Sequence, residues 1–366
     1  MPTHKTSAWP LAWVCLGLIL YASLYPFAPW RDQGIAPWFF LTAPLLTYWT
    51  GFDVVSNVLG YMPFGFFLAL AALRSGRSAV ALPMALLACA GLSLSMETLQ
   101  VYLPGRVPSN LDLLLNIGGG ALGAASAWSL ERLGVLLRWS RFRAHWFVAD
   151  ARGGLVLLAL WPVALLFPTV VPFGLGQVLE RLEAALAQWL VNSPLQEWLP
   201  LREVELQPML PAVEWSAVLL GLWIPCLLGY CIIGAWLKRV RFVVLLVGVG
   251  VASTALSNAL SYGPGYAWLW LTTPVKAAMV CVAVLAAALL WLPRRASAAL
   301  ALLALGLDLS LINQTPMGSY VAQTLFSWEQ GQFIRFYGLA QWLGWLWPFA
   351  ATVYVLNVLW DRAPES

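Results

Sequence analysis

The fold and the candidate site are best predicted from residues 97–123, ETLQVYLPGRVPSNLDLLLNIGGGALG. This stretch places charged and amide side chains between two long apolar runs. Its main polar residues are Glu97, Gln100, Arg106, Asp112 and Asn116. Ionisable side chains are costly near a membrane interior, so those that occur there usually have a partner, access to water or a function. We therefore treat this cluster as the candidate functional site.

The composition of the 366-residue chain is that of a membrane protein. Hydrophobic residues make up 61% of it and charged residues 10%, whereas charged residues are about a quarter of a soluble protein. Apolar runs of about 20 residues, the length that crosses a bilayer as a helix, recur between short polar breaks. These features predict an all-α fold, a polytopic transmembrane helical bundle of about ten spans. The protein is expected to be multi-pass, in contact with lipids of the inner (plasma) membrane.

The basic residues indicate orientation and not nucleic-acid binding, because they are dispersed among loops and form no single stripe. Cytoplasmic loops are enriched in Lys and Arg. One set of alternate loops is rich in them and contains Lys5, Arg74, Arg77, Arg132, Arg138, Arg141, Arg143, Arg152, Lys238, Arg239, Arg241, Arg294, Arg295 and Arg362. The other set contains Arg31, Arg106, Arg181, Arg202 and Arg335. Both termini are therefore predicted to be cytoplasmic, with the polar cluster toward the outer face.

The predicted helices fall into two domains, residues 1–150 with four spans and residues 151–366 with six. Within the second domain, the hydrophilic segment 174–212 is predicted to contain an amphipathic helix along the outer face. Residues 30–52 are aromatic and interrupted by prolines, which favours an interfacial or re-entrant segment. The spans are expected near residues 8–25, 53–73, 78–103, 109–130, 154–173, 213–237, 240–262, 267–292, 296–313 and 337–360.

Three of the expected helices carry polar residues at helical spacing, on faces that could meet. The helices that start near residues 53 and 109 each hold a carboxylate and an amide four residues apart, namely Asp53 with Asn57 and Asp112 with Asn116. The helix between them holds Ser93, Glu97 and Gln100 on one face. At 1.5 Å of rise per residue, Glu97 is expected at a depth close to that of the two asparagines.

A structural explanation is as good as a functional one for the two aspartates. Thr50 to Asp53 and Ser109 to Asp112 both have the capping-box spacing, so each Asp could do no more than cap its helix. Glu97 lies well inside a helix, where no cap explains it. The glycines of this region are interpreted as close-packing positions, since no strand precedes them as in a phosphate loop. They are Gly118, Gly119, Gly120 and Gly123.

At these positions the sequence resembles the VanZ-like membrane protein family. The resemblance rests on DxxxNxxxxxPFG at residues 53–65, on ExxQ at residues 97–100 and on RxxSxxDxxxNxxGxxxG at residues 106–123. It covers roughly residues 9–130. The resemblance implies a protein of the cell envelope, with links to glycopeptide resistance, through teicoplanin, and to envelope polysaccharide.

The leading hypothesis is an accessory protein with an outward-facing polar pocket for a lipid-linked or amphiphilic envelope molecule, such as a lipid-linked precursor or a glycopeptide. Arg106 would contact an anionic group. The expected ligand-binding residues are Asp53, Asn57, Glu97, Gln100, Arg106, Asp112 and Asn116. No metal or other cofactor is implied by this hypothesis.

Two alternatives stay open, a membrane hydrolase or transferase and a transporter. The catalytic candidates of the enzyme are Glu97, Arg106 and Asp112, with Glu97 as general base or with two carboxylates that hold Mg²⁺. Buried charges favour a transporter, and the lack of a visible internal repeat opposes it.

The second domain has polar residues of its own inside apolar runs, at Asn258, Lys276, Asp308 and Asn313. Lys276 and Asp308 are predicted to form an ion pair between their two helices, because an unpaired charge at that depth would be expensive. The cysteines are interpreted as small buried hydrophobic residues, since they lie in apolar runs without a CxxC pair. They are Cys15, Cys89, Cys226, Cys231 and Cys281.

Overall fold

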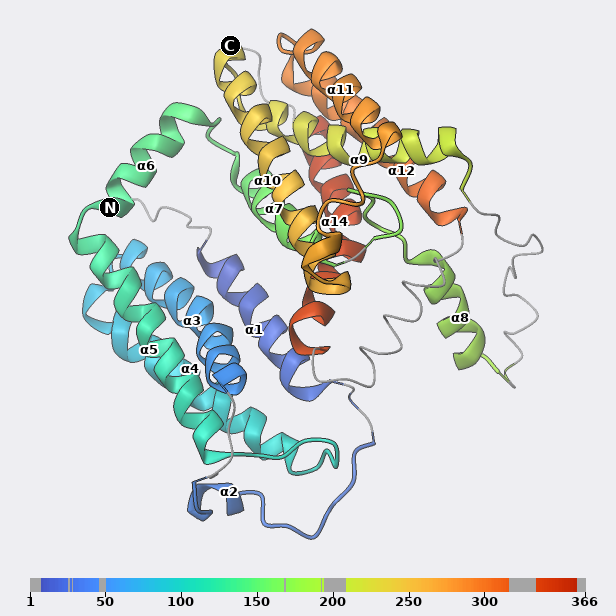
Figure 1. Cartoon of the computed structure of the whole chain (residues 1–366). Helices are drawn as coiled ribbons and strands as arrows, with labels where there is room; N and C mark the ends of the chain where they lie inside the picture. Colours follow the sequence, from blue (N-terminus) through green and yellow to red (C-terminus); the bar gives the residue numbers. More distant parts are fainter. Residues whose placement is uncertain are drawn as a thin grey trace. The chain divides into compact units, whose positions relative to one another are not determined.

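The computed structural model describes the chain in segments, and this part of the chain forms helices without strands. The described residues are 8–25, 27, 29–45, 51–167, 169–191, 193, 209–315 and 334–360. The chain divides into two compact units, Met1–Arg143 and Ala144–Ser366. Each unit has its own arrangement of helices and is described by itself (Figure 1).

The first unit is a bundle in which α3 contacts α1, α4 and α5. Figure 1 shows α3, α4 and α5 side by side. The short α2 precedes α3, and α6 follows α5. The bounds are α1 Ala8–Leu24, α2 Phe39–Thr42, α3 Gly51–Arg74, α4 Ser78–Gln100, α5 Asn110–Arg132 and α6 Val135–Trp146.

Glycines let the backbones of α3 and α5 touch. A Cβ atom on Gly119 would lie 2.3 Å from a backbone oxygen of α3, and one on Gly123 would lie 1.9 Å from another. A Cβ atom on Gly120 would lie 2.5 Å from the Cys89 sulfur of α4, whereas Gly118 faces open space. The close-packing interpretation is therefore confirmed for three glycines of the run and is wrong for Gly118, whose direction on the helix points away from both neighbours.

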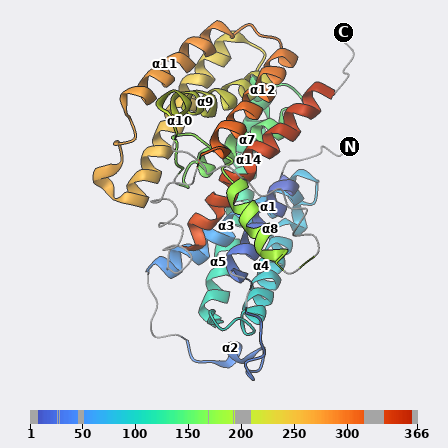
Figure 2. The same cartoon turned by 90° about the vertical axis from the view of Figure 1, so that its right-hand side faces the viewer.

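The second unit is built around α9, a helix that is apolar on all sides and therefore suited to a buried position. In the apolar stretch of α9 that is long enough to span a membrane, 78% of the residues are buried. The helix contacts α7, α10, α11 and α12 (Figures 1 and 2). The bounds are α7 Arg152–Ala164, α8 Leu179–Trp189, α9 Pro211–Ile232, α10 Trp236–Tyr262, the 3-10 helix η2 Pro264–Tyr266, α11 Thr273–Ala288, α12 Arg294–Asn313 and α14 Ile334–Trp360.

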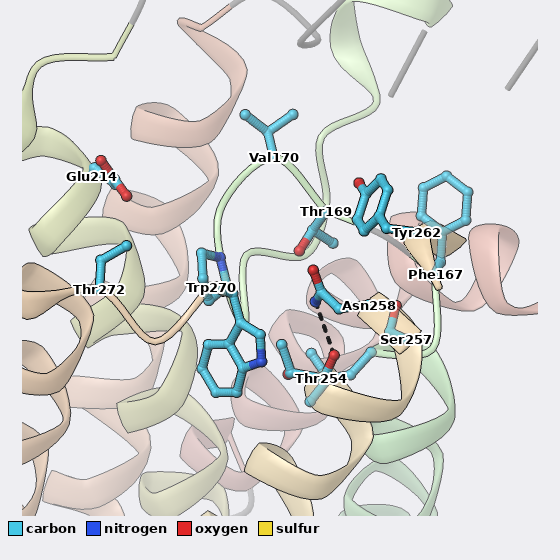
Figure 3. Close-up of a pocket in the computed structure, with 12 residues that line it drawn as sticks. Phe167, Thr169, Val170, Glu214, Thr254, Ser257, Asn258, Tyr262, Trp270 and Thr272 are labelled. Atoms are coloured by element: carbon cyan, nitrogen blue, oxygen red, sulfur yellow. Dashed lines mark hydrogen bonds between the residues drawn. The ribbon is translucent and has the colours of Figure 1, made fainter. Parts of the chain in front are cut away.

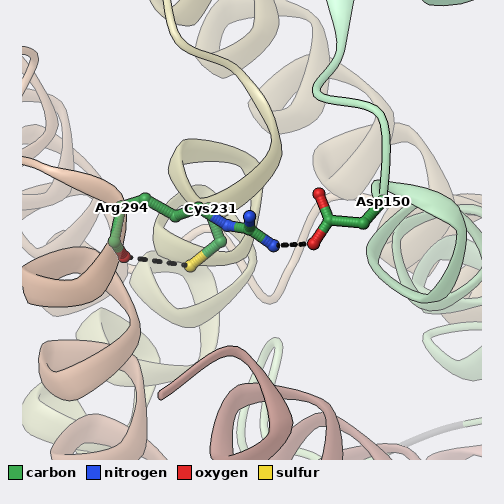
Figure 4. A network of polar contacts seen from close by, with 3 residues as sticks. All are labelled: Asp150, Cys231 and Arg294. Atoms are coloured by element: carbon green, nitrogen blue, oxygen red, sulfur yellow. Dashed lines mark hydrogen bonds and ion pairs between the residues drawn. The ribbon is translucent and has the colours of Figure 1, made fainter. Parts of the chain in front are cut away.

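One end of the second unit is basic, and its arginines bind neighbouring segments. Arg239 is buried and donates hydrogen bonds to four backbone carbonyl oxygens, two at the C-terminal end of α9 and two in the connection between α11 and α12. Arg294 forms an ion pair with Asp150, while the Cys231 thiol donates to the Arg294 carbonyl oxygen (Figure 4). These contacts tie the starts of α7, α10 and α12 to α9.

Seven helices, α3, α4, α5, α9, α10, α12 and α14, are long and apolar enough to cross a membrane. Helices α1, α7 and α11 are apolar but shorter. The all-helical membrane class is thus confirmed. The count of about ten spans and the cytoplasmic location of both termini stay predictions.

The span predicted at 154–173 is wrong in its extent, because α7 ends at Ala164. The segment after it turns through Phe173, with φ of 64°, and Gly176, with φ of 93°. These left-handed conformations cannot continue an α-helix. The span predicted at 267–292 is likewise shortened to α11, whose first turn contains Pro274.

The predicted ion pair between Lys276 and Asp308 is wrong. Lys276 is exposed on α11, whereas Asp308 is 2% exposed on α12. No ion pair between them occurs among the residues described. The cause is rotational, because α11 packs into the core through Val275 and Ala278, which turns Lys276 outward. A lysine near a helix end can extend to the interface, which makes this position acceptable.

Candidate functional site

Polar side chains of α3, α4 and α5 meet inside the first unit. The Asn57 amide of α3 donates to the Asp112 carboxylate of α5 across 2.9 Å. The Asn116 amide of α5 donates to the Ser93 hydroxyl of α4 across 3.0 Å. Residues of the three predicted polar faces are therefore brought together, and α5 is bonded to both of its neighbours.

Glu97 is 2% exposed, and its Oε2 accepts the backbone N–H of Ser109 at 2.9 Å. Ser109 is the N-cap of α5, and its hydroxyl accepts from the N–H groups of Leu111 and Asp112. In a capping box, the carboxylate on the N-cap N–H comes from the same helix. Here it comes from α4. The expectation that no cap explains Glu97 is wrong, because sequence spacing reveals caps within one helix and not caps supplied by another.

Arg106 and Gln100 bind the C-terminal end of α1. The Arg106 guanidinium donates to the carbonyl oxygens of Tyr25, at 2.6 and 3.1 Å, and of Ala22, at 3.1 Å. The Gln100 amide donates to the Ser23 carbonyl at 3.0 Å. The last carbonyl groups of a helix have no partner within it, and a cation there is also favoured by the helix dipole. Both side chains thus position α1.

Asp53 lies in the first turn of α3 and is half-buried. Thr50, its predicted capping partner, lies outside the described residues. Asp53, Glu97 and Asp112 supply the carboxylates of this region. Among the described residues, no group of three or more His, Cys, Asp or Glu side chains has an arrangement that could hold a metal ion.

Two buried polar atoms of the cluster have no hydrogen-bond partner in the part of the chain that the structure describes. They are Asn116 Oδ1 and Tyr61 Oη, in residues that are 5% and 4% exposed. The Ser93 hydroxyl accepts from the Asn116 amide and is also the polar side chain next to the Tyr61 hydroxyl, which lies near the charge of the Glu97 carboxylate. Buried unpartnered atoms are rare in proteins and often mark a site for water or another molecule.

Tyr61 is a site residue that was not among those predicted from the sequence. It lies four residues after Asn57 and therefore on the same side of α3, a spacing that could have identified it. Asn116 is six residues inside α5 and Tyr61 ten residues inside α3, which places them about 9 Å and about 15 Å from the starts of their helices. The site is accordingly inside the bundle and not on its surface.

No curated protein and no solved structure matches the chain. A family model does match, and the matched residues extend from the start of α1 into α6. Residues 7–136 match the family described as VanZ/LLP1, so the N-terminal part of this chain is VanZ-like.

Proposed function

We propose that this chain is a VanZ-type integral membrane protein of the cell envelope, whose first unit binds the polar group of an amphiphilic or lipid-linked envelope molecule. The proposal is carried by the buried atom Asn116 Oδ1, with the Tyr61 hydroxyl, a neighbour of Ser93, as a second polar group of the same cluster. A buried polar atom without a partner costs about 1–3 kcal/mol. A molecule that supplies a hydrogen bond to such an atom is therefore favoured in this cluster.

The two atoms favour a hydroxyl group as the ligand. An amide oxygen can only accept a hydrogen bond, while a phenol can donate one. A hydroxyl can donate to Asn116 and accept from Tyr61. The nearby Glu97 carboxylate disfavours an anion at the same point. Both envelope molecules that the VanZ resemblance suggests, a glycopeptide and a lipid-linked polysaccharide precursor, carry sugar hydroxyls.

Arg106 has a positioning role in this proposal, in place of the direct contact with an anionic group that the sequence suggested. Its bonds to the end of α1 support this role. Glu97 and Asp112 accept hydrogen bonds from the Ser109 backbone and the Asn57 amide, which supports a structural role for both carboxylates over a catalytic one.

The test compares variants of the two side chains. Tyr61→Phe removes only the hydroxyl and should retain folded yield in detergent. Asn116→Leu also breaks the bond to Ser93, so it is compared with Ser93→Ala, which loses that bond and keeps Asn116 Oδ1. Tyr61→Phe and Asn116→Leu should lose bound envelope lipid, measured by native mass spectrometry of the full-length protein. The expected loss is about threefold to tenfold in occupancy for Tyr61→Phe, the equivalent of one hydrogen bond. Tyr102→Phe, in the turn after α4, is the matched control.

Complementation tests the envelope role. A strain that lacks the gene should differ from wild type in teicoplanin susceptibility or surface polysaccharide. Expression of the Tyr61→Phe variant in that strain should fail to restore the wild-type behaviour. Equal lipid occupancy in wild type and both variants would refute the binding proposal. Full complementation by both variants would do the same.

A further inference from the structure

The second unit contains a polar cavity of about 250 Å³ that the proposed function does not use. Its walls come from the connection after α7, the first turn of α9, the last turns of α10 and the connection before α11 (Figure 3). Aromatic side chains and uncharged polar groups share the lining with one carboxylate. The residues that matter here are Glu214, Thr254, Ser257, Asn258, Tyr262 and Trp270.

Thr254 provides a buried hydroxyl in the cavity wall. It is 6% exposed, and its Oγ1 has no hydrogen-bond partner among the described residues. Its neighbours in the wall are held in place, because the Ser257 hydroxyl donates to the Leu166 carbonyl and the Asn258 amide donates to the Thr254 carbonyl, each at 2.9 Å. The cavity wall is therefore ordered and leaves one buried hydroxyl without a partner.

We propose that this cavity binds an uncharged, hydroxyl-rich group of about the size of one sugar ring. Water occupies about 30 Å³ per molecule, so the volume corresponds to about eight waters or one such ring. Trp270 and Tyr262 offer flat apolar surface next to polar atoms, a combination typical of small-molecule sites. Hydroxyl groups on the ligand can bond Thr254 and the Glu214 carboxylate.

The charge of the lining excludes an anionic ligand. Glu214 is the one charged residue among the described residues that line the cavity. It would repel a phosphate or a carboxylate, and no lysine or arginine of the described lining would compensate.

The cavity lies where α9 and α11 begin and α10 ends. The opposite helix ends carry Arg239, Arg241 and Arg294. By the positive-inside rule the basic end is cytoplasmic, so the cavity faces the other side of the membrane. The sugar would come from that side, either free or as the headgroup of a glycolipid.

The test uses the full-length protein in nanodiscs, with methyl glucoside and glucuronate as probes in isothermal titration. Methyl glucoside should bind saturably and glucuronate at least about tenfold more weakly, with the difference reduced in Glu214→Gln. Thr254→Val should weaken methyl glucoside binding by about threefold to tenfold, the equivalent of one hydrogen bond. Thr352→Val is the matched control, because the Thr352 hydroxyl bonds the Pro348 carbonyl of its own helix.

Nanodiscs that contain monoglucosyl diacylglycerol separate the two sources. If the glycolipid in the nanodisc competes with methyl glucoside, the ligand is a lipid headgroup. If methyl glucoside binds and the glycolipid does not compete, the ligand is a free sugar. The inference is overturned if neither the glycolipid nor methyl glucoside binds, if glucuronate binds equally well, or if Thr254→Val behaves like Thr352→Val. Tyr61→Phe should leave this binding unchanged, so a failure here is distinct from a failure of the site in the first unit.

Discussion

The carboxylate of Glu97 on α4 accepts the backbone N–H of Ser109, the N-cap of α5, at 2.9 Å. An acid of one helix thereby completes the cap of the next. Asp112, which a capping box within α5 would have used, instead accepts from Asn57 of α3. The start of α5 is thus fixed by both neighbouring helices, and the site is assembled by the same contacts that hold the bundle together.

Removal of the Glu97 side chain should destabilise the first unit. Glu97→Ala leaves the buried N–H of Ser109 without an acceptor, at a cost of about 1–3 kcal/mol. Glu97→Gln keeps an acceptor oxygen and should lose less. Thermal unfolding in detergent measures both, with Ser95→Ala on the exposed face of α4 as the control. Equal stability of Glu97→Ala and the control would show that the bond to Ser109 contributes little.

The two ends of one glycine run should respond in opposite ways to the same change. Gly123→Ala places a Cβ 1.9 Å from a backbone oxygen of α3, whereas Gly118→Ala meets nothing within 4 Å. Gly123→Ala should separate α3 from α5 and cost about 1–3 kcal/mol or more. Gly118→Ala should be neutral or slightly stabilising, because alanine favours helix more than glycine. Folded yield by size-exclusion chromatography distinguishes them, and similar yields would contradict the observed packing.

The hydrogen bonds of Arg106 should stabilise the last turn of α1. Arg106→Lys retains the charge but cannot reproduce the fork that reaches Tyr25 and Ala22. Hydrogen exchange measured by mass spectrometry should then increase in the last turn of α1 and stay unchanged in α4. Arg77→Lys, in the exposed turn before α4, is the control. Unchanged exchange in the last turn of α1 would mean that Arg106 does not position that helix.

Lys276 and Asp308 should be energetically independent. Lys276→Met and Asp308→Asn, singly and together, form a double-mutant cycle in thermal unfolding. The expected coupling energy is below about 0.5 kcal/mol, as for side chains that share no contact. Asp308→Asn alone should be neutral or stabilising, because it replaces a buried carboxyl group whose Oδ1 has no partner among the described residues. A coupling energy above about 1 kcal/mol would show that Lys276 and Asp308 interact, as the ion-pair prediction required.

The proposed orientation predicts which helices are accessible from outside the cell. In a cysteine-free background, Gln188→Cys on α8 should react with a membrane-impermeant maleimide in intact cells. Arg141→Cys on α6 should react only after the membrane is permeabilised. Both side chains are exposed, so burial does not explain a difference. The reverse pattern would invert the orientation and place both proposed sites on the cytoplasmic side.

The sequence by itself determined the class of the protein and the helices that carry the first site. Long apolar runs with few charges can satisfy their backbone hydrogen bonds in a membrane only as helices, and the spacing of Asn57, Ser93 and Asn116 placed them on faces that meet. These are local properties, which depend on residue type and on a period of 3.6 residues. The glycine spacing likewise predicted close packing, which the structure confirms at Gly119, Gly120 and Gly123, but it did not identify the partner helices.

The tertiary structure decided which partner each polar group has. Glu97 caps a helix that starts twelve residues later, Arg106 binds carbonyl groups more than eighty residues earlier, and Lys276 faces away from Asp308. The rotation of one helix against another sets these pairs, and rotation follows from the packing of apolar faces over the whole unit. The cavity beside Thr254 has the same origin, because its walls come from segments that only packing brings together.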